Sequence, residues 1–433
     1  MRGQGSGVSI KHMTSETILF RDRALKIDSE PIFCKPLLQI IVGLALAAAL
    51  VPALAQKKYD SGASDTEIKI GQTKPYSGPA SAYSSAGRVQ LGYFEKLNSE
   101  GGVNGRKIKL ISLDDAFTPP KTVEQTRKLV EQDEVLLVFN SNGTAANSAV
   151  QKYLNARKVP QLFVSSGASK FSDPKNFHWT MGWLPTYYSE ARAYAHYLLK
   201  HRPDARIGVL YQNDDFGKDY LNGLHDELGS KAKSMIVAEV SFELSDPTID
   251  SQIVSLKASG ADTFFNIGTA KFAAQAIRKA YDIGWKPLQF VSIVGSSVGQ
   301  VMVPAGPEKG VGVITMGFVK DPTDPQWDPD PAMKQWRAFM KKYYPDGDLT
   351  DWYNVYAYVV AQTLVQVFKQ CADDLTRENV MKQAANLKNV ELPLLLPGIR
   401  INTSPADYRV IRQVQLQRFD GKQWVRFGEL IAN

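Results

Sequence analysis

From residue 66 onward, short apolar runs rich in β-branched and aromatic residues alternate with segments of helical periodicity. Strands that alternate with helices form parallel sheets, because each parallel connection needs a crossover that helices supply on both faces. We therefore predict an α/β protein with two doubly wound parallel-sheet lobes in series. The runs are TEIKIGQ, RKIKLISL, VLLVFN and PQLFVS in the first series, and ARIGVLYQ, SMIVAEVSF, DTFFNIG, LQFVSIV and VGVITMGFV in the second.

The pattern changes after the second series. Three further helices are predicted within residues 331–389, and VIRQVQLQRFDGKQWVRF, with its Asp420-Gly421 turn, predicts a closing antiparallel hairpin. The stretch DPTDPQWDPDP at 321–331 is expected to be a proline-stiffened surface loop. Its aspartates lack the spacing of a calcium loop, so no metal site is predicted.

Residues 36–51, PLLQIIVGLALAAALV, form the one long apolar run. With Lys35 before it and Ala53 and Ala55 after it, the run predicts a secretory signal cleaved after Ala55, and hence a periplasmic location. A membrane anchor is the alternative, although the run is shorter than the ~20 residues of a spanning helix. The 35 residues ahead of the run form a segment that is too long and too acidic to be the basic flank of a signal peptide. Residues 1–55 are therefore treated as leader plus extension, with the start expected at Met13 or beyond.

Composition excludes several classes of function. Of 433 residues, 44% are hydrophobic, enough for large cores. Without residues 1–55, 45 basic and 40 acidic side chains remain, spread without a basic block, so a nucleic-acid partner is not expected. Cys371 is then the only cysteine, which rules out an internal disulfide. Cys34 precedes the apolar run and is not placed like a lipid-modified cysteine.

One segment resembles a catalytic motif. GSSVG at 295–299 fits G-x-S-x-G, with Ser297 as the nucleophile, but Pro304 is expected to interrupt the helix that must follow. The class also needs a histidine later in the chain, whereas His178, His196, His201 and His225 all precede Ser297. No zinc, Walker or dinucleotide motif occurs, so we predict no catalytic residue, cofactor or metal and keep an exported serine hydrolase as an alternative.

Four strand ends run into small turns rich in serine, threonine and glycine. These residues are ordinary helix N-caps, so a single turn of this kind indicates little. Four of them at the carboxyl ends of strands in two lobes favour a crevice for a small anion, closed by hinge motion. The turns are YSGPASAYSSAG (76–87), NSNGTAAN (140–147), SSGAS (165–169) and NIGTAKF (266–272).

Several longer segments carry a resemblance to a known family. They are SGPASAY, LNSEGGVNGRKIKLISLDDAFTPPKTVEQTRKLV, VPQLFVSSGAS, VLYQNDDFGKDY and FFNIGTAKFAAQAIRKAYDIGW. In this order the chain resembles the periplasmic solute-binding proteins of ABC importers, in the leucine/isoleucine/valine-binding branch. The resemblance implies the type I fold with a multi-crossing hinge, a monomer without enzymatic activity, and a membrane permease as partner. The implied lobes are 66–184 plus 319–395 and 185–318 plus 396–433.

The resemblance also implies a ligand site between the lobes. In the family, loops of the N-terminal lobe hold the ligand carboxylate, and aromatic residues close over the ligand from both lobes. The matching positions are Asn142, Gly143, Thr144, Ala168 and Ser169 for the carboxylate, Tyr83 and Phe216 for the aromatic walls, and Thr269 in the next turn.

Departures from the family pattern narrow the class of ligand that we expect. Val294 stands where amino-acid-binding relatives carry an acid for the ligand ammonium, and an unpaired buried charge costs several kcal/mol. Met181 replaces a frequent arginine, with Trp183 close by, which favours a flat apolar ligand body. Phe117 occupies the first position of a disulfide found in some relatives. Branched-chain amino acids are the family default, and an aromatic or aliphatic carboxylate without an α-amino group is the sharper expectation. A receptor domain that signals to a membrane kinase is a further alternative.

Overall fold

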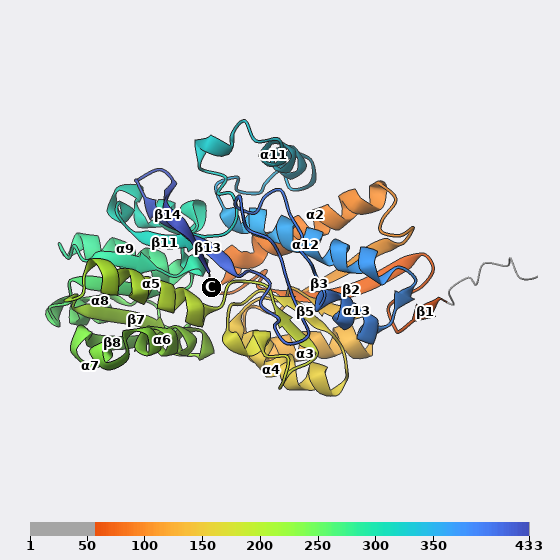
Figure 1. Cartoon of the computed structure of the whole chain (residues 1–433), viewed down its shortest axis with the longest axis horizontal. Helices are drawn as coiled ribbons and strands as arrows, with labels where there is room; N and C mark the ends of the chain where they lie inside the picture. The colour runs from red at the N-terminus through yellow and green to blue at the C-terminus, as the bar shows by residue number, and fades with distance from the viewer. Residues whose placement is uncertain (1–56, 433) are drawn as a thin grey trace, which may run out of the picture. The chain divides into compact units, whose positions relative to one another are not determined.

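The computed structural model describes residues 57–432, which contain both predicted sheets (Figure 1). The predicted leader, its cleavage after Ala55 and Cys34 lie outside the described residues. The first sheet has five parallel strands in the order β3-β2-β4-β5-β6. They are β2 (Glu67–Lys74), β3 (Lys107–Asp114), β4 (Leu137–Phe139), β5 (Gln161–Val164) and β6 (Thr180–Gly182).

Helices cover both faces of this first sheet. On one face α2 (Ser85–Ser99) packs along α12 (Trp352–Cys371), and on the other α3 (Pro119–Glu131) packs against α4 (Thr144–Ala156) (Figure 1). The order of the strands reverses at β2, which lies between β3 and β4. The loops after β2 and β4 therefore diverge from a topological switch point, where ligands bind in open α/β sheets.

The second sheet has seven strands in the order β14-β13-β11-β10-β9-β7-β8. Its parallel part has its own switch point at β7, between β8 and β9, and the hairpin β13–β14 adds the antiparallel edge that the Asp420-Gly421 turn predicts. The strands are β7 (Ile207–Gln212), β8 (Ile236–Phe242), β9 (Thr263–Ile267), β10 (Leu288–Val291), β11 (Ile314–Gly317), β13 (Gln413–Phe419) and β14 (Trp424–Ala432).

Helices α5 (Tyr187–His201) and α6 (Asp215–Leu228) pack together on this second lobe, as do α8 (Asp250–Ala258) and α9 (Ala270–Asp282). The predicted α/β fold with two parallel-sheet lobes is thus confirmed. None of the described helices combines the length and the hydropathy needed to cross a membrane. The remaining helices are α7 (Ala232–Met235), α10 (Val303–Ala305), α11 (Pro331–Tyr343) and α13 (Arg377–Ala384).

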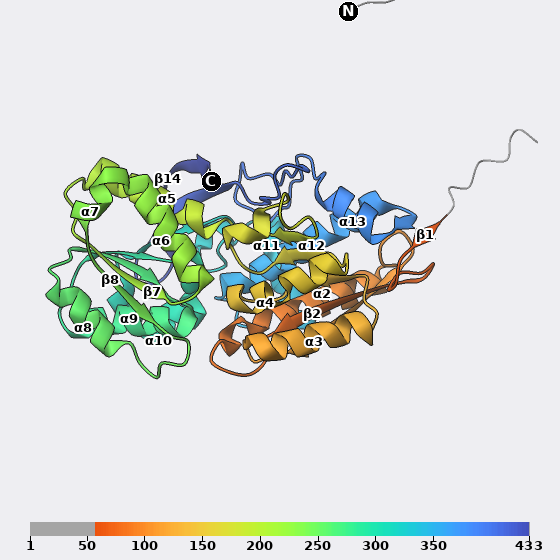
Figure 2. The same ribbon diagram turned by 90° about the horizontal axis from the view of Figure 1, so that it is seen from below.

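The chain passes between the two sheets three times. It leaves β6 for α5, returns from β11 through α11 to α12, and passes from α13 back to β13 (Figures 1 and 2). Because the described residues form one compact unit, the predicted lobe boundaries stay a prediction. Connections of this kind permit hinge closure of one lobe on the other.

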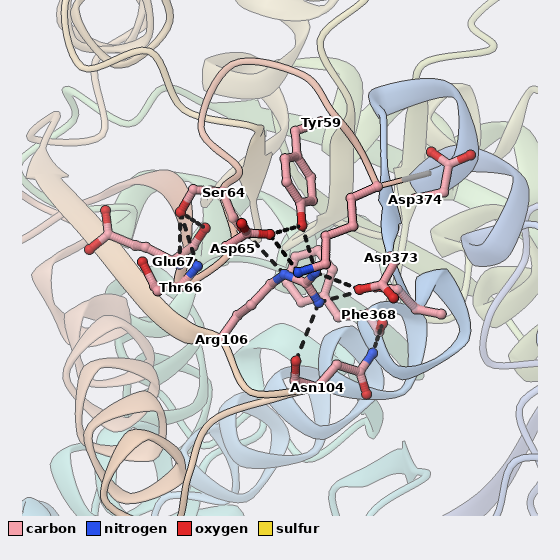
Figure 3. A network of polar contacts seen from close by, with 12 residues as sticks. Tyr59, Ser64, Asp65, Thr66, Glu67, Asn104, Arg106, Phe368, Asp373 and Asp374 are labelled. Carbon is pink, nitrogen blue, oxygen red and sulfur yellow. Dashed lines mark hydrogen bonds and ion pairs between the residues drawn. The ribbon is translucent and has the colours of Figure 1, made fainter. Parts of the chain in front are cut away.

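A buried arginine fixes the start of the described chain to the first lobe (Figure 3). The Arg106 side chain is 3% exposed, and its guanidinium contacts Asp373 Oδ1 at 2.6 Å and donates to the Tyr59 hydroxyl at 2.8 Å. Beside it, β1 (Lys58–Tyr59) pairs with β12 (Asp374–Leu375). Strands of two residues have no alternating pattern, which is why the sequence did not predict them.

Candidate functional site

A small cavity lies where the carboxyl ends of the strands of both sheets meet. Its volume is about 30 Å³, close to that of one water molecule in the liquid. The lining residues come from the loops after both switch points and from the beginnings of α5 and α12. They are Tyr83, Phe117, Asn142, Gly143, Thr144, Ser165, Tyr187 and Tyr353, together with Gln212, Asp214, Phe216, Thr269 and Val294.

The N-terminus of α4 faces this cavity. Gly143 and Thr144, its N-cap and first residue, line the cavity, and no side chain caps the helix. The first amides of a helix have no intrahelical partner and carry the positive end of the helix dipole. This part of the wall is therefore suited to an anion.

Gly143 cannot be replaced by a larger residue without strain. Its φ is 88°, in the left-handed region, and a Cβ atom there would lie 2.4 Å from the Phe117 ring. Phe117 is itself left-handed, with a φ of 59°, and the Asp115 carboxylate holds its N–H at 2.9 Å. A bulky residue in this region is uncommon, and such strain gathers at ligand sites.

A buried lysine supports the loop that leads to α4. Lys74, at the end of β2, donates to the Asn140 carbonyl oxygen at 2.6 Å and to Asn140 Oδ1 at 3.0 Å. Burial lowers the pKa of Lys74 to about 7. Asn140 in turn donates to the Phe163 carbonyl oxygen and to the Tyr356 hydroxyl, which fixes the direction in which the loop starts.

Aromatic rings form much of the remaining wall. Tyr83 packs edge-on to Tyr353, with ring centroids 5.3 Å apart, and Tyr187 packs edge-on to Phe216 at 4.9 Å. The Tyr353 hydroxyl donates to Asn142 Oδ1 at 2.8 Å and so accepts from Ser165. Rings of this kind bury an apolar ligand body at little cost in conformational entropy.

Tyr83 also joins the two lobes. It belongs to a short 3₁₀ helix of the first lobe, Ser81–Ser84. Its hydroxyl donates to the Val294 carbonyl oxygen and accepts from the Ala270 N–H, both at 2.8 Å. Ala270 is the first residue of α9, so the hydroxyl occupies one of that helix's unpaired amides.

The single acid among the described residues that line the cavity is already satisfied. Asp214 caps α6 by accepting from the N–H groups of Phe216 and Gly217, and Gln212 donates to its other oxygen at 2.6 Å. Burial raises the pKa of Asp214 above its usual value. Its carboxylate thus already accepts three hydrogen bonds inside the protein.

Further contacts join the lobes around the cavity. Ser169 donates through its N–H and its hydroxyl to Asp219 Oδ2, both at 3.0 Å, and Lys170 forms an ion pair with Asp215. On another side, Asp351 accepts from the Ser297 hydroxyl at 2.8 Å. Burial raises the pKa of Asp351 to about 7.

The structure brings most of the predicted site residues together. Tyr83, Asn142, Gly143, Thr144, Phe216, Thr269 and Val294 line the cavity. Ala168 and Ser169 instead line a neighbouring inter-lobe pocket of about 300 Å³. Trp183 does not line the cavity: it is fully buried, donates to Thr363 Oγ1 and packs against Phe318 and Tyr356 in the core.

Several lining residues were missed by the sequence reasoning. Tyr353 comes from α12, far along the chain, and no local pattern relates it to Tyr83. Asp214 does have a signal, since it precedes a helix directly after a strand, at the position of an N-cap. Phe117 was considered only as a replacement for a cysteine, although its Asp-Asp-Ala-Phe turn also follows a strand end.

The surroundings of Ser297 differ from the prediction in one respect. Pro304 does not prevent helix formation, because a π-helical turn, Val298–Met302, and then α10 follow Ser297. Proline is tolerated there since it lies in the first turn of α10. The described histidines contact Glu378, Glu227, Glu239 or Tyr197, and none hydrogen-bonds Ser297. Within residues 57–432, no group of three or more His, Cys, Asp or Glu side chains is placed to hold a metal ion.

Comparison with known proteins agrees with this architecture. A family model described as periplasmic binding protein matches residues 67–423. The Leu/Ile/Val-binding protein homolog 1 of Brucella suis is 25% identical over 357 residues, which are 80% of this chain and 89% of that protein.

Two solved structures share the fold. A branched chain amino acid ABC transporter protein from Thermus thermophilus with bound valine has a TM-score of 0.76 and 14% identity, covering 86% of this chain and 98% of that one. A fatty acid ABC transporter substrate-binding protein from Thermomonospora curvata has a TM-score of 0.74 and 22% identity, covering 87% and 95%. The predicted resemblance is confirmed: this chain belongs to the periplasmic binding protein family, and Leu/Ile/Val-binding protein homologues are among its relatives.

Proposed function

We propose that this protein is the substrate-binding component of an ABC importer and captures a small carboxylate that lacks an α-amino group. In this proposal it acts in the periplasm as a monomer, after removal of the leader at Ala55, and delivers its ligand to a membrane permease. Family membership supports the periplasmic location and the transport role. The residues that line the cavity indicate the class of ligand.

The proposal rests on the contrast between two groups in the cavity wall. The N-terminus of α4 has no side-chain cap, whereas the Asp214 carboxylate already accepts hydrogen bonds from the protein. Asp214 caps α6, and the first amide of α9 donates to Tyr83. A carboxylate at the N-terminus of α4 would accept hydrogen bonds from the free amides of the first turn and from the Thr144 hydroxyl. The aromatic rings of Tyr83, Tyr187 and Tyr353 would then cover its apolar body.

An ammonium group finds little in this cavity. The Asp214 carboxylate has three donors already, and Val294 offers only a carbonyl oxygen that accepts from Tyr83. Burying an ammonium without a counterion costs several kcal/mol. The fold itself serves both ligand types, since one structural neighbour holds valine and another is described as a fatty acid transporter protein.

Binding on this proposal requires the lobes to separate. The cavity of about 30 Å³ is several times too small for a carboxylate with a ring or a branched chain. Entry therefore breaks the cross-lobe contacts of Tyr83, Ser169 and Asp351, and some of them re-form when the lobes close on the ligand.

Matched ligand pairs test the role of the amino group. Isothermal titration calorimetry compares 4-methylpentanoate with L-leucine and 3-phenylpropanoate with L-phenylalanine, since the members of each pair differ only by the α-amino group. We expect the amine-free acid to bind more tightly by about tenfold or more in at least one pair. Tight binding of leucine with no binding of 4-methylpentanoate would contradict the amine-free ligand and would leave the family role intact.

A further inference from the structure

A large cavity in the described part of the chain lies away from the cleft between the lobes. It is a groove of about 750 Å³ on the second lobe, between α5 and the hairpin β13–β14, which lie side by side at the edge of that lobe (Figure 2). Pockets for small molecules usually measure ~300–1,000 Å³. The groove is therefore large enough for a complete ligand.

One wall of the groove is a stripe along α5. Ala193, Tyr197 and His201 recur every fourth residue, so they lie on one face of the helix. Across from them, Phe427 packs edge-on to Tyr197 with ring centroids 6.0 Å apart, and Leu430 continues the apolar floor. Partly exposed rings and aliphatic side chains thus form the floor of the groove.

The opposite wall of the groove contains a β-bulge in the hairpin β13–β14. Gln415 pairs with Leu430 and Gln417 with Arg426, so three residues of β14 bulge opposite the single residue Leu416. Gly428, in this bulge, has a φ of 68°, and its carbonyl oxygen accepts from Gln415 Nε2 at 2.7 Å. Bulges re-aim side chains at the edges of sheets and beside binding sites. Here the bulge carries Phe427 onto the groove wall.

The charges of the groove favour an anion. Arg192 and Glu227 neutralise each other through a 2.8 Å contact, and His196 also contacts Glu227. Lys200 and Arg418 line the groove without a carboxylate within 4.0 Å among residues 57–432, whereas Glu429 is the one other acid of the lining. The permanent charge of the residues that line the groove is therefore positive by one unit.

We propose that this groove is a second binding site, for an amphipathic organic anion whose carboxylate or sulfonate meets Lys200 and Arg418. Its apolar body would lie on Tyr197, Phe427 and Leu430. The Arg418 guanidinium already lies 5.2 Å from the centroid of the Phe427 ring, so that ring and charge act on neighbouring parts of one ligand. All of these residues belong to the second lobe, so the site is independent of lobe closure and of the proposed transport ligand.

Fluorescence titration with 8-anilinonaphthalene-1-sulfonate, an aromatic sulfonate that brightens in apolar surroundings, tests this site. We expect saturable binding by the folded protein and displacement by decanoate, with much weaker displacement by decyltrimethylammonium. Lys200→Gln combined with Arg418→Gln should weaken binding by about tenfold or more. The matched control is Lys231→Gln with Lys233→Gln, which removes two exposed charges of the same lobe outside the groove.

Two further variants keep the test decisive. Lys200→Gln alone changes an exposed side chain, so it should fold normally and should show part of the loss. Tyr83→Ala alters the cleft between the lobes, which shares no lining residue with the groove, so the sulfonate should still bind this variant and Lys200→Gln with Arg418→Gln should cause the same loss in it as in the wild type. The proposal is overturned if no saturable binding occurs, if the groove variants bind like the wild type, or if Tyr83→Ala abolishes the signal.

Discussion

Removal of the Tyr83 hydroxyl tests how the two lobes are held together. Tyr83→Phe keeps the ring, which packs on Tyr353, and deletes two buried hydrogen bonds of 2.8 Å to Val294 and Ala270 of the other lobe. At a net ~0.5–1.5 kcal/mol each, the two bonds together contribute about 1–3 kcal/mol to the closed arrangement. This corresponds to roughly a 5- to 150-fold change in the ratio of closed to open protein.

Calorimetry and small-angle X-ray scattering measure this change. We expect Tyr83→Phe to weaken ligand binding and to increase the radius of gyration of the ligand-free protein. Tyr83→Ala should weaken binding further, because the loss of the buried ring adds about 1–3 kcal/mol.

A matched tyrosine provides the control for this experiment. The Tyr76 hydroxyl contacts Ser112 Oγ at 2.6 Å within the first lobe, so Tyr76→Phe removes a tyrosine hydroxyl without touching the other lobe. If Tyr83→Phe and Tyr76→Phe give the same scattering profile and affinities within about twofold of each other, the inter-lobe role of Tyr83 is refuted.

Three further predictions concern Asp351, Gly143 and Ser297. Burial raises the pKa of Asp351 from 3.8 in the unfolded chain to about 7 in the folded protein. Between about pH 4 and 7 the folded protein therefore keeps a proton on this carboxyl group that the unfolded chain has released. The free energy of unfolding should therefore fall as the pH rises from about 4 to 7, and urea titrations should show a shallower fall in Asp351→Asn. Gly143→Ala should lower that free energy by more than Gly101→Ala does, since both glycines are left-handed but only Gly143 faces the Phe117 ring. Ser297→Ala should loosen lobe closure in scattering and leave p-nitrophenyl ester hydrolysis at the wild-type background; an ester activity that depends on Ser297 would revive the hydrolase.

The strands and the cavity loops could be predicted because their signals are local. Apolar runs bounded by turn residues identified the strands of both sheets except β6, which has only three residues, and the carboxyl ends of parallel strands meet at one edge by geometry. For that reason loops as distant in the sequence as 140–147 and 266–272 were expected at one site. Tyr83, Thr144 and Thr269 do line one cavity.

The rest of the site depends on long-range packing that has no local signal. A tryptophan directly after a strand looks the same in sequence whether it faces a cleft or the core. Trp183 faces the core, where it packs against Tyr356 of α12, and the neighbouring Tyr353 of that helix lines the cavity instead. The absence of an acid at Val294 was visible in the sequence, whereas the three donors that satisfy Asp214 were visible only in the structure.

The most direct test of the proposed function is to identify the ligand that the protein selects from a natural mixture. Protein freed of ligand by unfolding, dialysis and refolding is incubated with a small-molecule extract of cells, washed, and denatured to release what it holds. Mass spectrometry then identifies the released compound. We predict an organic acid without an amino group, in about one-to-one ratio to the wild-type protein and depleted in Tyr83→Ala. Stoichiometric leucine, isoleucine or valine in the wild-type sample would contradict the account.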